Sequence, residues 1–141
     1  MSHPFPSAEW VAALRAAIND SEPYRAASTD WTHGAVALVV SPDPGLGIEA
    51  AVAIWLDLDR GVCRDARLVP PDDAAEAPFV LTADYARWKA ILRKELSPIA
   101  GILRRQLALR GSLAIVVRFV RSAEALVAAA AAVPTRFLDE R

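Results

Sequence analysis

The sequence predicts an α/β fold in one domain, and three features of its patterning support this prediction. Apolar side chains recur at helical spacing near the start of the chain and again through much of its second half. Between these regions the side chains alternate with a period of two, as in a strand with one buried face. The length of 141 residues suits a single hydrophobic core. We therefore expect residues 1–141 to form a single domain.

The first helix is expected over residues 7–18. Ser7 is a favoured N-cap residue, and Glu9 lies in the first turn, where the helix dipole favours a negative charge. Apolar side chains then recur on one face as far as Ile18. The polar segment that follows, over residues 22–34, is expected to consist of turns.

Strands are expected in the next part of the chain. Residues 35–40 are rich in valine and leucine, and residues 41–45 contain the prolines and the glycine of a turn. From Ile48 to Asp59 one face carries the larger apolar side chains, and the other carries the acidic residues and Trp55. Residues 59–61 then turn the chain into a strand over residues 62–69, which predicts a β-hairpin.

The second half is expected to be mainly helical. After a short strand over residues 79–81, Thr82 is expected to cap a helix that reaches Leu96. Ser97 and Pro98 are typical of the start of another helix. A short strand is expected over residues 107–110, ending at Gly111.

A last helix is expected from Ser112 to about Ala132. It is apolar on most sides, since its polar side chains are confined mainly to a few positions around Arg118 and Arg121. Such a helix must be covered on most sides. One sheet covers only one side, so we expect a second layer, a partner or an apolar ligand to cover the other.

The composition excludes several classes of protein. Hydrophobic residues make up 54% of the chain, although 29 of them are alanine, and this excludes global disorder. Cys63 is the only cysteine and cannot form an internal disulfide. With His3 and His33 as the only histidines, a metal site of the Cys/His type is also excluded, and no cofactor is implied.

The first ten residues lack the basic start and apolar run of a secretory signal. Charged side chains interrupt the most apolar stretch, residues 107–133, so we expect no membrane-spanning helix. These features favour a cytoplasmic location.

The net charge of −1 hides a strong asymmetry. Residues 1–84 hold 13 acidic and 5 basic side chains, whereas residues 85–121 hold 9 basic side chains and only Glu95 as an acid. A helical region that is this basic favours an anionic partner, such as a lipid headgroup or an acidic protein. The alternative is internal balance, with the basic helices lying near the acidic half.

The segment from Phe79 to Leu113, FVLTADYARWKAILRKELSPIAGILRRQLALRGSL, resembles the sterol carrier protein (type two) lipid-transfer family. The shared pattern is a short strand, a helix with an aromatic residue near Trp88, and then Leu96 and Pro98. A short helix, a strand and Gly111 before an apolar helix complete it. With the hairpin and the first helix, the resemblance extends over nearly the whole chain.

This resemblance implies a five-stranded, mainly antiparallel sheet covered by helices, with an apolar tunnel between them. It also implies non-catalytic binding or transfer of a lipid: a fatty acid, a fatty acyl-CoA, a phospholipid or a sterol. By position, the tunnel candidates are Phe79, Trp88, Leu92, Ile99, Ile102, Leu103, Leu113, Val116, Val117 and Val120.

Arginines make this region more basic than a purely apolar sterol pocket. Arg104, Arg105, Arg118 and Arg121 are candidates for contact with an anionic headgroup or an anionic membrane surface. The dipole of the short helix also favours cations at Arg104 and Arg105 without any ligand. The apolar tunnel candidates likewise have an alternative role as plain core residues.

No group of residues predicts catalysis, so we do not expect an enzyme. His33 has no nucleophile nearby in the sequence, and Asp57 and Asp59 are typical of solvated acids at a strand end. Nucleic-acid binding is not expected, because the first half is acidic and no exposed aromatic platform is apparent. The alternative to a lipid carrier is an interaction module whose apolar groove takes a partner helix or a second copy of the chain, giving a homodimer.

Overall fold

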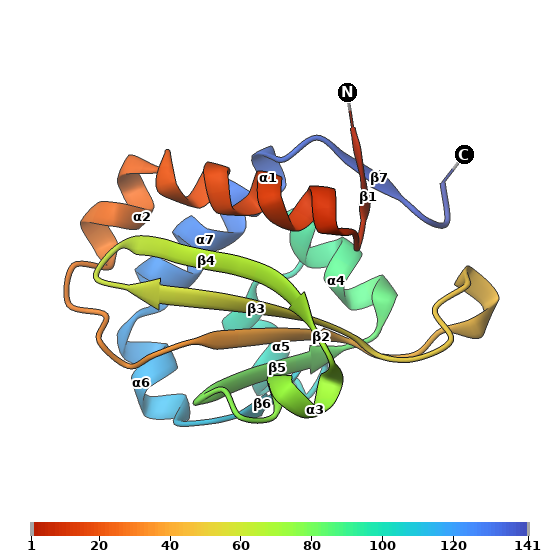
Figure 1. Ribbon diagram of the computed structural model, residues 1–141. Coiled ribbons are helices and arrows are strands. Elements are labelled where there is room, and N and C mark those ends of the chain that lie inside the picture. Colours follow the sequence, from red (N-terminus) through yellow and green to blue (C-terminus); the bar gives the residue numbers. More distant parts are fainter. Residues whose placement is uncertain (1, 141) are drawn as a thin grey trace.

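A five-stranded sheet lies at the centre of the computed structural model, which describes residues 2–140 (Figure 1). The strand order is β4–β3–β2–β5–β6. Only the central pair, β2 and β5, is parallel, and the other three pairs are antiparallel. This confirms the mainly antiparallel five-stranded sheet. The strands are β2 (Val36–Val40), β3 (Val52–Asp59), β4 (Val62–Val69), β5 (Phe79–Ala83) and β6 (Ala108–Arg110).

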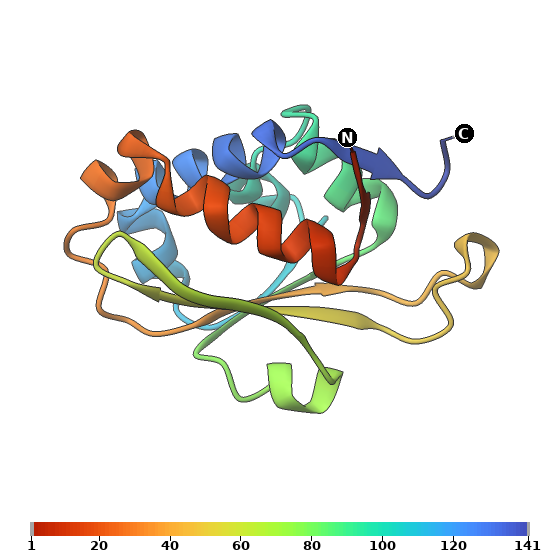
Figure 2. The same cartoon turned by 45° about the horizontal axis from the view of Figure 1, so that its top comes forward.

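Helices cover one face of this sheet, and α3 (Pro71–Ala74) packs on the opposite face (Figure 2). The long helices α1 and α7 run across the covered face, where α7 contacts both α1 and α2. The helices of this layer are α1 (Ala8–Asn19), α2 (Glu22–Ala27), α4 (Tyr85–Leu92), α5 (Pro98–Leu103), α6 (Leu113–Arg118) and α7 (Val120–Ala132).

The alternation in β3 places its side chains as predicted. Ile54, Leu56 and Leu58 are buried under the helices, whereas Trp55 packs on the opposite face. The strand begins later than expected, at Val52. The 3-10 turn η1 (Pro44–Leu46) precedes it, and residues 43 and 48 exchange backbone hydrogen bonds of 2.8 and 3.0 Å across this turn.

The turn between β3 and β4 explains the tight hairpin. Arg60 and Gly61 both have positive φ, of 49° and 87°, as a two-residue hairpin turn requires. The Arg60 amide also donates to the carbonyl of Trp31, at 2.8 Å, and this bond holds the turn against the loop before β2.

One helix was not expected, and another, α4, begins later and ends earlier, at Leu92, than predicted. Residues 22–27, expected as turns, form α2, because Ser21 caps the helix by accepting from the Tyr24 amide and a proline suits its first turn. Thr82 lies inside β5, and Asp84 caps α4 in its place by accepting from the Arg87 amide.

The last helix is two helices rather than one. Phe119 has φ −103° and ψ 34°, which breaks the helix between α6 and α7. Its ring packs edge-on against Trp31 and His33, with centroids 5.0 and 5.5 Å away. The β-branched run of residues 115–117 also lowers helix propensity in α6. Because of this break, α6 and α7 present different faces to the sheet.

The two ends of the chain form a second sheet, which the sequence analysis missed. Strands β1 (His3–Phe5) and β7 (Thr135–Phe137) pair in parallel. The Tyr85 hydroxyl fastens both strands to α4, since it donates to the Phe5 carbonyl at 2.7 Å and accepts from the Leu138 amide at 2.9 Å.

The junction between β6 and α6 requires a glycine. Gly111 has φ +133°, and a Cβ there would lie 2.7 Å from the Pro78 carbonyl oxygen. We expect Gly111→Ala to lower the free energy of unfolding by about 1–3 kcal/mol, as for other strained backbone positions. Gly45→Ala is the matched control, because its Cβ would have only one neighbour, 3.5 Å away. Denaturant unfolding tests this, and equal stability of the two variants would contradict it.

Candidate functional site

Two apolar cavities lie between the sheet and the helix layer. The first, which we name the α4 cavity, has a volume of about 80 Å³. Strands β2, β3 and β5 form its floor, and α1, α4 and α7 form its walls. The floor includes Leu38 and Leu56, and the walls include Leu14, Trp88 and Val127.

The second cavity, which we name the α6 cavity, also has a volume of about 80 Å³. It lies at the other end of the same strands, over Val36, Leu58 and Phe79. Val116 of α6 and Phe119 close it from the helix side. The two cavities share Leu81, Ala123 and Leu126 in their linings, so they lie directly end to end.

No Asp, Glu, Lys or Arg of residues 2–140 lines either cavity. The indole N–H groups in the α4 cavity are also occupied, because Trp10 donates to Thr135 and Trp88 donates to the Val39 carbonyl, each at 2.9 Å. With its polar groups already paired, the α4 cavity offers a ligand only apolar surface.

The α6 cavity carries hydroxyl-bearing residues. Ser122 accepts from Ser28 at 2.8 Å and donates to the Ala27 carbonyl at 2.9 Å, which ties α7 to α2. Tyr24 also lines this cavity, and burial raises the pKa of its hydroxyl to about 12. Tyr24 therefore stays neutral at physiological pH.

The structure distributes the predicted tunnel residues over several environments. Trp88 and Leu92 line the α4 cavity, and Phe79 and Val116 line the α6 cavity. Ile102 and Leu113 instead border a shallow depression beside β6, together with Arg105.

The other four predicted residues line neither cavity. Ile99 and Val120 are half-buried, whereas Leu103 and Val117 are exposed, with 65% and 45% of their surface accessible. The prediction assumed one continuous last helix, whereas Val117 belongs to the separate helix α6 that ends before Phe119.

The sequence analysis did not predict most of the residues that form the floor of the cavities, nor those of α7 that line them. The floor was detectable, because Leu56 and Leu58 belong to the alternating row that the sequence analysis assigned to one face. In α7, Ala123, Leu126 and Ala130 recur at helical spacing, but alanine gives little signal in an alanine-rich helix.

The predicted anion-binding arginines lie on the surface, directly after α5 and on α6 and α7. Arg104, Arg105, Arg118 and Arg121 are exposed, and none forms an ion pair with a carboxylate of residues 2–140. The exposed side chains of Leu103, Leu113 and Val117 belong to the same two short helices, α5 and α6.

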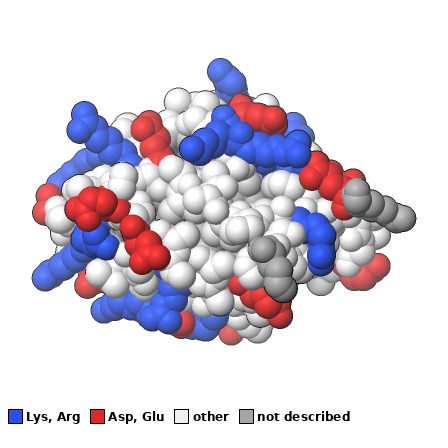
Figure 3. Space-filling view, turned by 90° about the horizontal axis from the view of Figure 1, so that it is seen from above, with Lys and Arg blue, Asp and Glu red and all other residues white. Residues whose placement is uncertain are grey.

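Other basic residues of the second half are balanced internally. Lys89 pairs with Asp139 and Glu140 at 2.9 and 2.8 Å, and Arg93 pairs with Glu140 at 2.7 Å. Seen from above, charged side chains lie mainly around the rim and the middle of this face is largely uncharged (Figure 3). Ion pairs with the C-terminal segment thus neutralise Lys89 and Arg93, but no such pair within residues 2–140 neutralises the four arginines.

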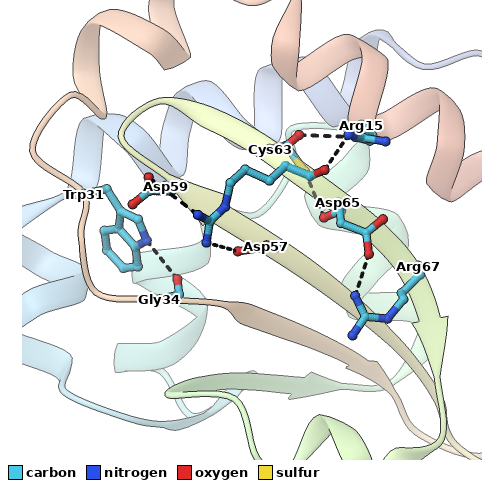
Figure 4. A network of polar contacts seen from close by, with 9 residues as sticks. Arg15, Trp31, Gly34, Asp57, Asp59, Cys63, Asp65 and Arg67 are labelled. Carbon is cyan, nitrogen blue, oxygen red and sulfur yellow. Dashed lines mark hydrogen bonds and ion pairs between the residues drawn. The ribbon is translucent and has the colours of Figure 1, made fainter.

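The paired carboxylates of the hairpin are ion-paired rather than poised for catalysis. Arg64 lies 2.9 Å from Asp57 and 3.9 Å from Asp59, and Arg67 pairs with Asp65 in the same way (Figure 4). These pairs are exposed, so they contribute little to stability.

His33 and Cys63, the other residues with chemically reactive side chains, are both packed against neighbouring residues of the fold. The His33 ring packs edge-on against Trp31 at 5.2 Å. Cys63 is buried beneath α1, where Arg15 and Asn19 donate to its carbonyl. Within the described chain no three His, Cys, Asp or Glu side chains cluster as metal ligands would. No helix in residues 2–140 has both the length and the apolarity to cross a membrane.

Comparison with known proteins finds one family model, described as the SCP-2 sterol transfer family, that matches residues 12–124. No curated protein sequence matches the chain. A crystal structure of a sterol carrier protein 2 is 38% identical, with a TM-score of 0.84 over 90% of this chain and 97% of that one.

A protein of Thermus thermophilus, described as possibly a sterol carrier protein, is 37% identical with a TM-score of 0.83. The match covers 92% of this chain and 90% of that one. A palmitated sterol carrier protein of Aedes aegypti shares the fold at 12% identity, with a TM-score of 0.56. That match covers 81% of this chain and 90% of the other.

The surroundings of Cys63 predict an inert thiol. Its side chain is fully buried, and burial raises the pKa of the thiol to about 11. The thiolate is the reactive form, so at pH 8 only about one molecule in a thousand carries it. We expect a disulfide reagent such as DTNB to leave the native protein unmodified at pH 8 and to label it fully in guanidinium. Rapid labelling of the native protein would contradict this burial.

Proposed function

Because the chain belongs to the SCP-2 sterol transfer family, we propose that it binds a lipid in the α4 and α6 cavities and transfers it without chemical change. The observation that supports this proposal is the pair of apolar cavities that lie between sheet and helices and that no charged side chain of residues 2–140 lines. Each CH₂ group moved there from water contributes about 0.8 kcal/mol, before the cost of ordering the ligand is subtracted.

A fatty acyl chain is the ligand class that we propose. The apolar linings suit an alkyl chain, and no charged side chain of residues 2–140 lines either cavity, so the polar head of such a lipid would lie outside them. A relative of the same fold, from Aedes aegypti, is described as palmitated. Binding of this kind requires no nucleophile or general base, in keeping with the ion-paired Asp57 and Asp59.

The arginines that form no ion pair within residues 2–140 support a further part of this proposal, which concerns loading of the lipid. Arg104 and Arg105 directly follow Leu103 at the end of α5, and Arg118 follows Val117 in α6, so these cations lie beside exposed apolar side chains. Such a mixture of cations and apolar side chains suits the surface of an anionic membrane, where each basic residue contributes about 1 kcal/mol. The surface also lies close to the α6 cavity, to which α6 contributes Val116.

Lipid binding is tested by placing a larger side chain in the wall of the α4 cavity. Val127 lines the α4 cavity, whereas Val117 is exposed and lines neither cavity. We expect Val127→Phe to lower the affinity for a fluorescent fatty acid about tenfold, because the larger ring takes the space of several methylene groups. Val117→Phe is the matched control and should bind as the unmodified protein does.

Native mass spectrometry of the purified protein tests lipid binding independently, because it detects a bound lipid by its mass. A lipid that co-purifies with the unmodified protein, and is lost from Val127→Phe, is the expected result. Thermal unfolding confirms that both variants fold. A protein that carries no lipid and binds no fatty acid, whether as monomer or dimer, would contradict the lipid-carrier function and favour an interaction module.

Membrane contact is tested by charge reversal. Arg104→Glu together with Arg105→Glu should weaken pelleting with anionic liposomes and slow lipid transfer, while leaving lipid-binding capacity intact. The attraction should also fade with added salt, because the Debye length is about 8 Å at physiological ionic strength.

The control reverses the same number of charges on β4, at the opposite edge of the sheet, as Arg64→Glu with Arg67→Glu. If both double variants lose pelleting equally, net charge rather than the α5–α6 surface is responsible. Equal pelleting of the unmodified protein on neutral liposomes would also contradict membrane contact through the arginines.

A further inference from the structure

We propose that the α4 and α6 cavities are two compartments of one binding site, separated by a waist at Leu81 and Leu126 that admits a flexible alkyl chain and selects against a rigid fused-ring lipid. This inference rests on the proposed function, because it specifies which class of lipid the same cavities take.

The sheet side of the waist is the side chain of Leu81 in β5. In the sheet, Leu81 lies between Leu38 of β2 and Leu109 of β6. Leu38 lines the α4 cavity and Leu109 lines the α6 cavity, whereas Leu81 lines both. Leu81 therefore marks the boundary between the two compartments on the floor of the site.

The helix side of the waist is formed by α7. Ala123 and Leu126 are three residues apart, so they lie on one face of the helix, and both line both cavities. Ser122, one residue earlier, borders only the α6 cavity, and Val127 and Ala130 border only the α4 cavity. The order of residues along α7 thus repeats the order of the compartments, over about 12 Å from Ser122 to Ala130 at the usual helical rise.

The waist is made of side chains that have room to move. Leu81, Ala123 and Leu126 are only half-buried although they lie between sheet and helix, because space adjoins them on both sides. A leucine can change rotamer into such space without displacing the backbone. Rotation of Leu81 and Leu126 would join the compartments into one channel wide enough for a single chain.

A rigid ring system needs a different kind of opening. Each compartment holds about 80 Å³, and a plate of fused rings cannot bend around a side chain between them. Admitting it would require α7 to move away from the sheet. The buried Ser28–Ser122 hydrogen bond and the buried Ala125 and Ala129 hold α7 within the helix layer.

The test measures binding of palmitate, octanoate and the fluorescent sterol dehydroergosterol to three variants and to the unmodified protein. Leu126→Phe should close the waist and lower the affinity for palmitate about tenfold, while the affinity for octanoate, whose chain has half as many carbon atoms, changes less than about twofold. Leu126→Ala should widen the waist and strengthen dehydroergosterol binding relative to palmitate. Val117→Ala, on the exposed face of α6, is the matched control and should change none of the three.

The unmodified protein provides a readout that does not depend on the folding of a variant. It should bind palmitate at least about tenfold more tightly than dehydroergosterol, since only a flexible chain can pass the waist. Equal affinity for these two ligands would contradict the proposed waist. An equal loss of affinity for palmitate and octanoate in Leu126→Phe would do the same, and both results would leave the lipid-carrier function intact. Failure of the unmodified protein to bind any of the three overturns the carrier function itself.

Discussion

The structure depends on a mismatch between a sheet with large side chains and a covering helix with small ones. The helix-facing side of β2 and β3 presents valine, leucine and isoleucine, whereas alanine fills most of the buried positions of α7. Alanines allow α7 to lie close to α1 and α2, but they cannot fill the space above the sheet. Unfilled apolar space costs about 24 cal/mol for each Å³, so each cavity costs on the order of 2 kcal/mol when empty. The protein therefore gives up stability at the place where an apolar ligand would restore it.

The elements that follow local rules could be predicted from the sequence, and those that follow tertiary contacts could not. The cap at Ser7, the alternation in β3 and the hairpin at residues 59–61 are local signals, and each appears in the structure. At the break, Phe119 packs against Trp31, a residue far away in the chain, and the β-branched run of residues 115–117 is only a weak local signal for it. The parallel pairing of β1 with β7 joins the two ends and gave no local signal.

The same division holds for the candidate site. The family resemblance concentrated attention on residues 79–120, and four of its ten tunnel candidates line the cavities. The floor from β3 and the side of α7 that bears Leu126 were left out, because a helix apolar on most sides does not reveal which side faces the sheet. The charge asymmetry was informative only in part. Lys89 and Arg93 are balanced by the C-terminal carboxylates, and the arginines of α5–α7 remain as the distinctive group.

The tethered ends of the chain also contribute to the α4 cavity. Chain termini usually fray unless they are tied down, and here β1, β7 and the exposed ion pairs of Lys89 form the tie. This small sheet is also anchored by apolar packing, because Phe5 of β1 and Phe137 of β7 are both buried in the main core. Its Phe5 is also part of the wall of the α4 cavity. The position of Phe5 in this wall, and with it the shape of the α4 cavity, therefore depends on a pairing between the two most distant parts of the chain.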